Sequence, residues 1–195
     1  MKLVLMGRVK YKPNYHNKCV LRINSSRFKS GHFTKCSFRN AHICNSDFVG
    51  VNLKGNNFRN AKISNCIFIH CNFSKSTFKD CAFESVYFCA CKFSDCKDFF
   101  KIPKSMVYKN TQNFKKSINI ENYVLSNLVD IKCEKNRILT ISSTKINTWT
   151  IGILLNDFSE IDLLQYFKYL KKSKQKKIKT VKNYKDSIEH FLNKI

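Results

Sequence analysis

The sequence predicts a mainly β solenoid followed by a smaller, partly α-helical region. The first observation is a period of five: fourteen positions, in steps of five from Phe28 to Phe93, hold large apolar residues, and eleven of them are Phe. The second is that thirteen of the fourteen residues two positions earlier are small, with only Asn56 out of character. The third is that Asp98 breaks this period, after which helical spacing appears.

Neither an α-helix nor a flat strand keeps one face inward at a period of five. A chain that turns a corner every five residues does, because the large and the small residue of each unit then both point inward. Four such sides close a square coil of twenty residues, and successive coils stack about 4.8 Å apart. We therefore expect the solenoid at 21–97, with residues 1–20 as a β-like lead-in or cap.

The segment after the repeats is expected to be a connector and cap over residues 98–117. Phe99 and Phe100 begin it. Large aromatic side chains close the open core at the end of a solenoid, whose terminal repeats need such capping.

Residues 118–195 are expected to form a mixed, helix-rich basic region. Residues 137–155 have β-branched and apolar stretches of ambiguous type, whereas Ser159 and Asp162 form a capping-box pattern at the start of an amphipathic helix. The apolar residues at helical spacing in that helix are Ile161, Leu164, Phe167 and Leu170. A last helix is expected from about Asn183, with Ile188, Phe191 and Leu192 on one face.

Units such as "CNFSK", "CAFES" and "VNLKG" resemble those of the pentapeptide-repeat proteins. The resemblance covers about residues 21–97 and implies a right-handed quadrilateral β-helix. Some members of that family protect or inhibit DNA gyrase by mimicking the shape and negative charge of DNA. The outer positions here are basic, which disfavours direct mimicry, and a topoisomerase-interacting role stays among the alternatives.

Most of the cysteines occupy the small inward position, where they alternate with Ser, Ala, Gly and Val. Buried free Cys behaves as a small hydrophobic residue, and we interpret these as core residues: Cys36, Cys66, Cys71, Cys81, Cys91 and Cys96. Cys44 and Cys89 fall at outward positions, and no thiol and histidine share a place that suits a ligand set. We predict no metal site, no cofactor and no catalytic residue.

One outer side of the coil is predicted to be apolar. Sorting the outward positions by the period of twenty places five residues in one row: Val49, Ile67, Ile69, Tyr87 and Cys89. Such a row forms an exposed hydrophobic patch unless something covers it. The favoured cover is the C-terminal region of the same chain, and the alternative is a second copy or a partner protein.

Another outer side is predicted to carry a column of cations, Arg39, Arg59 and Lys79, with small polar neighbours. Like charges directly opposite are unfavourable on a sheet, and an anionic ligand would relieve their repulsion. The alternative is that these long side chains extend into water at little cost.

Residues 168–185 contain nine lysines and no acid, with Tyr166, Tyr169 and Tyr184 in or near this segment. Lysines interleaved with aromatic residues suit contact with a phosphate backbone and base stacking. The candidate lysines are Lys171, Lys172, Lys174, Lys176, Lys177 and Lys179. A solvated charged helix or a flexible tail is the alternative.

The formal net charge of +23, with a sequence pI near 9.7, implies an acidic partner: nucleic acid, a ribonucleoprotein, an anionic membrane surface or an acidic protein. No apolar run approaches the length of a membrane span. Gly7, Arg8 and Lys10 interrupt the apolar start before a signal-peptide core forms, so a cytoplasmic or other reducing compartment is expected. The sequence has no Gly-rich phosphate loop, nucleophile elbow or recognisable carboxylate pair, and we expect no enzyme.

The leading hypothesis is a non-catalytic scaffold that attaches to nucleic acid or a ribonucleoprotein through Arg39, Arg59, Lys79 and the lysines of residues 171–179. The alternative is a protein-interaction or assembly module, including a homodimer, that uses the apolar row.

Overall fold

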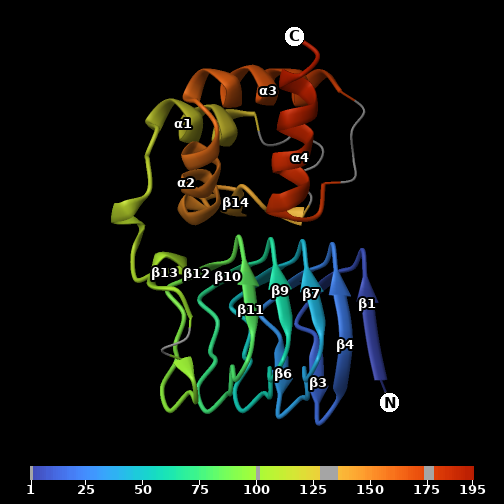
Figure 1. The fold of residues 1–195 in the computed structure, drawn as a ribbon. Helices are drawn as coiled ribbons and strands as arrows, with labels where there is room; N and C mark the ends of the chain where they lie inside the picture. The colour runs from blue at the N-terminus through green and yellow to red at the C-terminus, as the bar shows by residue number, and fades with distance from the viewer. Residues whose placement is uncertain (1, 100–101, 128–135, 174–177) are drawn as a thin grey trace. The chain divides into compact units, whose positions relative to one another are not determined.

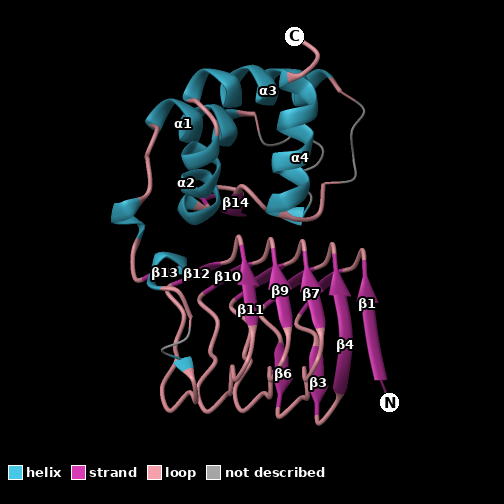
Figure 2. Ribbon diagram, viewed as in Figure 1, coloured by secondary structure: helices cyan, strands magenta, loops and turns pink. Residues whose placement is uncertain are grey.

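A computed structural model describes residues 2–99, 102–127, 136–173 and 178–195. The chain divides into two compact units, Met1–Asn110 and Thr111–Ile195. Figure 1 shows the first unit as stacked strands and the second as a group of helices, and Figure 2 colours the two kinds of structure separately. The predicted solenoid and the predicted helix-rich region are therefore both confirmed.

The first unit is a four-sided β-helix of parallel strands. Its strands are β1 (Lys2–Met6), β2 (Val9–Tyr11), β3 (Asn14–His16), β4 (Cys19–Asn24), β5 (Arg27–Lys29), β6 (His32–Thr34), β7 (His42–Cys44), β8 (Asp47–Val49), β9 (Lys62–Ser64), β10 (Ile67–Ile69), β11 (Ala82–Glu84) and β12 (Tyr87–Cys89). Side A is the sheet β1-β4-β7-β9-β11. Side B is the sheet β13-β12-β10-β8-β5-β2, in which β13 is Val107–Tyr108. Side C continues the pair β3-β6 through single bridges at 52, 72 and 92, and side D consists of bridges at 19, 37, 57, 77 and 97.

The corners explain the period of five. Every fifth residue from Ser25 to Asp95 has a positive φ, between 47° and 69°. L-residues other than Gly, Asn and Asp rarely adopt this conformation, and eight of these fifteen positions are Asn, Asp or Gly. Each corner thus turns the chain onto the next side.

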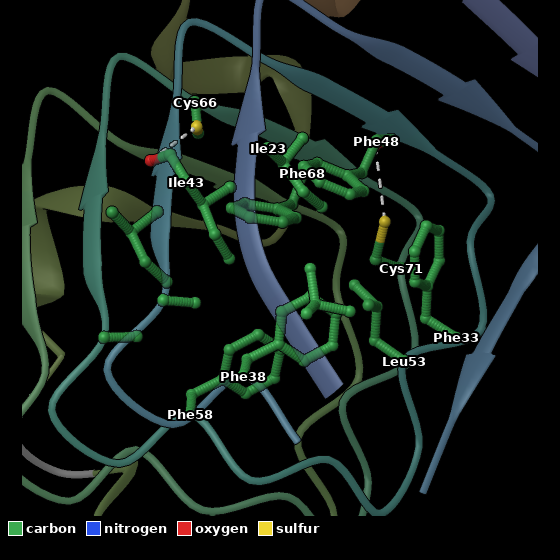
Figure 3. Close-up of a cluster of buried hydrophobic side chains, with 14 of the residues drawn as sticks. Ile23, Phe33, Phe38, Ile43, Phe48, Leu53, Phe58, Cys66, Phe68 and Cys71 are labelled. Atoms are coloured by element: carbon green, nitrogen blue, oxygen red, sulfur yellow. Dashed lines mark hydrogen bonds between the residues drawn. The ribbon is translucent and has the colours of Figure 1, made fainter. Parts of the chain in front are cut away.

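The core consists of columns of stacked rings. On side D, Phe58 lies between Phe38 and Phe78, with ring centroids 4.6 and 5.1 Å apart. On side B, Phe48 and Phe68 are 4.8 Å apart and nearly parallel. All five rings are at most 1% exposed, and Figure 3 shows four of them beside the aliphatic side chains of sides A and C.

The small inward position has a hydrogen-bonding role as well as a steric one. The Cys66 thiol donates to the carbonyl oxygen of Ile43 at 3.5 Å, and the Cys71 thiol donates to that of Phe48 at 3.3 Å (Figure 3). Asn56, the exception in size, does the same: its amide nitrogen donates to the Phe33 carbonyl at 2.6 Å. Donor capacity toward the preceding coil therefore explains why Cys, Ser and one Asn occupy this position.

Residues 1–20, expected to be a lead-in, contribute most of a complete first coil. β1, β2 and β3 pair in parallel with β4, β5 and β6. This coil is shorter by two residues, since Val9 lies opposite Arg27 rather than twenty residues from its partner. Lys10 lies opposite Phe28, so a lysine takes a central position. The first coil was not recognised from the sequence, because its register departs from the period of five and a lysine replaces the large apolar residue.

Aromatic and aliphatic side chains pack on the far end of the β-helix. The Phe99 ring lies 4.4 Å from that of Phe93, and Ile102 is 4% exposed within the same core. Phe100 lies outside the described residues. After a short 3₁₀ turn, η2 (Lys104–Met106), strand β13 (Val107–Tyr108) pairs with β12.

The second unit begins with the 3₁₀ turn η3 (Thr111–Asn113). It contains α1 (Ile118–Ser126), the hairpin β14 (Thr140–Ser142) and β15 (Lys145–Ile146), then α2 (Thr148–Asp157), α3 (Glu160–Lys172) and α4 (Val181–Leu192). The ambiguous stretch at 137–155 therefore holds both a hairpin and a helix. The side chain of Asn119 on α1 donates to Glu160 on α3 at 2.8 Å.

Helix α3 has the predicted capping box. The Ser159 hydroxyl accepts from the Asp162 N–H at 3.1 Å, and the Asp162 carboxylate accepts from the Ser159 N–H at 3.3 Å. Its buried face differs from the predicted one, because Ile161 is 67% exposed. The buried residues are Leu163, Tyr166, Phe167 and Leu170.

Candidate binding surface

The predicted column of cations exists on side D. Arg39, Arg59 and Lys79 follow three stacked phenylalanines in successive coils, and all three are exposed. The backbone keeps them in register, because the Asn40 N–H donates to the Arg59 carbonyl at 3.0 Å and the Asn60 N–H donates to the Lys79 carbonyl at 2.9 Å. The three positive charges therefore start from equivalent points along one side.

A second row lies across the adjacent corner, on side A. Arg22 pairs with His42, and His42 pairs with Lys62, in strands β4, β7 and β9, and all three residues are exposed. Only the corner residue Asn40 and the inward-facing Ala41 separate His42 from Arg39 along the chain. We call the two rows together the basic ridge: Arg22, Arg39, His42, Arg59, Lys62 and Lys79. The second row was not predicted from the sequence, although Arg22, His42 and Lys62 recur at the period of twenty.

Acidic residues are scarce around the basic ridge. The first 79 residues contain fifteen Lys or Arg and a single acid, Asp47. Asp47 is buried on side B, where its carboxylate accepts from the Arg27 guanidinium at 2.7 Å. The ridge from Arg22 to Lys62 therefore has no exposed carboxylate earlier in the sequence to neutralise it, and the first exposed acid is Asp80, beside Lys79.

A hollow of about 260 Å³ lies on side A. Its lining includes His42 and Lys62 of the ridge, the polar side chains of Cys44 and Ser64 and, at its far end, Glu84. The ridge therefore borders a depression with hydrogen-bonding groups rather than a smooth wall.

The predicted apolar row lies on side B. Ile67, Ile69 and Cys89 are 4%, 2% and 0% exposed, whereas Val49 and Tyr87 are half-buried. The ring of Tyr108, on β13, stacks on Tyr87 at 5.8 Å. The row is thus mostly buried, and its use as an interface stays a prediction.

The lysine-rich segment is described only in part. Lys171 and Lys172 are exposed at the end of α3, Lys179 is half-buried, and the Lys171 ammonium donates to Asn127 at 2.9 Å. Lys174, Lys176 and Lys177 lie outside the described residues.

The tyrosines expected to flank that segment for base stacking are mostly inaccessible. Tyr166 and Tyr184 are fully buried, and only Tyr169 is exposed, at 46%. Two of the three aromatic side chains therefore belong to the core of the second unit.

Three thiols of the β-helix core, those of Cys66, Cys71 and Cys81, lack the environment of a nucleophile. Burial raises the pKa of Cys66 and of Cys71 well above its ordinary range, and burial raises the pKa of Cys81 to about 11. A reactive cysteine needs a lowered pKa. Among the described residues, no group of three or more His, Cys, Asp or Glu side chains could hold a metal ion.

The comparisons with known proteins agree with the architecture of the first unit. A family model described as pentapeptide repeats matches eight copies, over residues 25–60 and 57–95. No curated protein matches the sequence. Within the described ranges, no helix has the length and hydrophobicity needed to span a bilayer.

Three solved structures match part of this chain. QnrB1, a plasmid-mediated fluoroquinolone resistance protein, is 22% identical with a TM-score of 0.29, and the match covers 50% of this chain and 49% of QnrB1. A pentapeptide repeat protein from the thylakoid lumen of Arabidopsis thaliana is 13% identical, with a TM-score of 0.27 and coverage of 62% and 76%. Rfr23 from the cyanobacterium Cyanothece 51142 is 10% identical, with a TM-score of 0.27 and coverage of 53% and 89%.

Proposed function

We propose that this chain is a non-catalytic interaction scaffold, built on the pentapeptide repeats of residues 25–95, and that its basic ridge binds an acidic surface of a partner protein. The observation that carries this proposal is the ridge itself: six basic side chains in two rows, in register from coil to coil, with one exposed acid, Asp80, beside its last member Lys79. A β-helix with a filled core holds such rows rigidly, so binding need not order the backbone of the scaffold.

The spacing of the rows suits an acidic helix. Successive coils are about 4.8 Å apart, so the three cations of side D start at about 0, 4.8 and 9.6 Å along the axis. Carboxylates at positions i, i+3 and i+7 of an α-helix lie at about 0, 4.5 and 10.5 Å. Long Arg and Lys side chains absorb differences of this size, and each cation can meet its own carboxylate.

A protein partner is favoured over single-stranded nucleic acid by the scarcity of stacking groups. Binding of unpaired bases combines a basic groove with exposed aromatic side chains. The ridge contains no Phe, Tyr or Trp and only one aromatic ring, the imidazole of His42, and Tyr166 and Tyr184 are buried. Attachment to nucleic acid or a ribonucleoprotein, which the charge alone also permits, is the competing outcome of the experiment.

The experiment compares two triple variants of the full chain. One reverses the cations of side D, Arg39→Glu, Arg59→Glu and Lys79→Glu. The matched control reverses three exposed lysines elsewhere on the β-helix, Lys35→Glu, Lys54→Glu and Lys75→Glu, so both variants lose six units of net charge. Each protein serves as bait in nuclease-treated extract of the native host.

We expect proteins that survive nuclease treatment to be captured by the wild type and the control, and to be lost with the ridge variant. Binding to a labelled polyglutamate peptide should weaken at least tenfold in the ridge variant only. The proposal fails if nuclease abolishes capture, if duplex DNA or RNA binds more tightly than polyglutamate at equal salt, or if the two variants lose binding equally.

A further inference from the structure

The first coil leaves one edge of each sheet open. β1 pairs only with β4 and stands at the end of the five-stranded sheet, while β2 and β3 end their own sheets. Within the described residues, no strand pairs with the other edge of β1. An unpaired edge presents a row of backbone N–H and C=O groups that can add another strand.

The core behind this edge is already closed, so the end is not simply a hydrophobic opening. Leu3 and Leu5 of β1 are 8% and 4% exposed. Lys10 occupies the central position of the next side, and its ammonium donates to the Tyr15 hydroxyl at 2.9 Å and lies 5.4 Å from the centre of the Tyr15 ring. The groups at this end that lack hydrogen-bond partners within the sheet are therefore the backbone N–H and C=O groups at the open edge of β1.

The charge at this end argues against a second copy of the chain. Residues 1–20 hold five Lys or Arg and no acid. Lysines at a sheet edge oppose edge-to-edge pairing of like molecules, and two such ends would repel each other. The same charge attracts an acidic strand.

The side chains of β1 define what such a strand should carry. Val4 and Met6 point outward and are each 52% exposed, which favours apolar neighbours at the middle of an added strand. Lys2 begins β1, and Arg8 follows its last residue by two positions; both are exposed. Cations at the two ends of the strand favour acids at the two ends of its partner.

We propose that the edge of β1 binds an extended segment of a partner protein, apolar at its middle and acidic at both ends, as an additional strand of side A. This site lies at the end of the β-helix, where Arg22 of the basic ridge pairs with Val4, and it does not involve Arg39, Arg59 or Lys79.

The probe is a fluorescent nine-residue peptide with two acidic residues at each end and alternating Val and Thr between them. Its binding to the full chain is measured by fluorescence anisotropy. One control peptide has the same sequence with alternate backbone amides N-methylated, which removes hydrogen-bond donors and keeps the charge. A second control replaces the acids with lysines.

We expect saturable binding of the acidic peptide, at least tenfold weaker binding of the N-methylated peptide, and none of the lysine peptide. Amides of residues 2–6 should exchange hydrogen more slowly in the complex. The double variant Lys2→Glu, Arg8→Glu should lose at least tenfold in affinity, whereas the Arg39, Arg59 and Lys79 triple variant should bind the peptide as the wild type does.

The proposal is overturned if the N-methylated peptide binds equally well, because attraction would then be purely electrostatic. It is overturned as well if the acidic peptide fails to bind, or if sedimentation shows that a second copy of the chain already occupies this edge. Loss of peptide binding in the triple variant would assign the effect to the ridge instead.

Discussion

At the scale of single residues, space decides what the inward position of a coil accepts. Gly31 occupies this position opposite the shortened first coil. A Cβ atom added at Gly31 would lie 2.7 Å from the Pro13 carbonyl oxygen and even closer to the Pro13 ring. Contacts of this kind are not tolerated without movement of the backbone.

We therefore expect Gly31→Ala to lower the free energy of unfolding by about 1–3 kcal/mol, measured by urea denaturation. Gly50→Ala is the matched control: an added Cβ has room there, 3.8 Å from its neighbour, but φ is +61°, so its cost of about 1 kcal/mol comes from the backbone. Adding Pro13→Gly should recover part of the loss at Gly31 and none at Gly50. Equal recovery at both would contradict the steric explanation.

The buried thiols make stability depend on alkaline pH. Burial raises the pKa of Cys81 from 9.0 to about 11 in the folded protein. A pKa that is higher in the folded state gives a stabilisation that is complete below pH 9 and is lost as the pH rises through 11. We expect the free energy of unfolding to fall over this interval. In Cys81→Ser the fall should be less steep, and the two slopes should differ by up to about 1.4 kcal/mol per pH unit. Identical slopes in the two proteins would show that this thiol does not contribute.

At the scale of one element, each side of a coil depends on the rings above and below it. Phe58 is 1% exposed and stacks between Phe38 and Phe78. Truncation to Ala should cost about 3–5 kcal/mol. Phe58→Leu should cost about 1 kcal/mol, because Leu53 already fills a central position on the neighbouring side. Urea denaturation of the two variants measures both losses, and a similar loss in both would argue that stacking rather than filled volume stabilises the column.

The elements were predictable to different extents, for physical reasons. Residues 21–97 followed from sequence because each side repeats one inward pattern, and the same pattern assigned Arg39, Arg59 and Lys79 to one column. The first coil was not predicted, because the spacing of its inward residues is irregular. Val20 and Ile23 both point into the core, but they are three residues apart and the period requires five. The apolar row was assigned to the correct strands, yet a sequence period says which way Ile67 points and not whether its side chain is buried.

At the scale of the whole molecule, a net charge of +23 works against the folded state. Salt shortens the range of that repulsion from about 30 Å at 0.01 M to about 10 Å at 0.1 M. We expect the melting temperature to rise by about 2–5 °C over this interval, measured by differential scanning fluorimetry. The Arg39, Arg59 and Lys79 triple variant, whose net charge is lower by six units, should show a smaller rise. A melting temperature that falls with salt would mean that attraction between charges dominates.

Because the chain turns a corner at every fifth residue, the core pattern repeats every five residues, whereas the pattern on one outer side repeats every twenty. A five-residue insertion that follows the repeat adds one complete side, so every later residue keeps its inward or outward place. All later sides, however, turn by a quarter of a revolution: an insertion after Asn45 would move Arg59 and Lys79 away from Arg39 and onto the next wall. Only an insertion of a whole coil of twenty residues keeps the outer columns aligned. Selection on the outer surface therefore permits insertions of twenty residues, whereas the core alone would permit insertions of five.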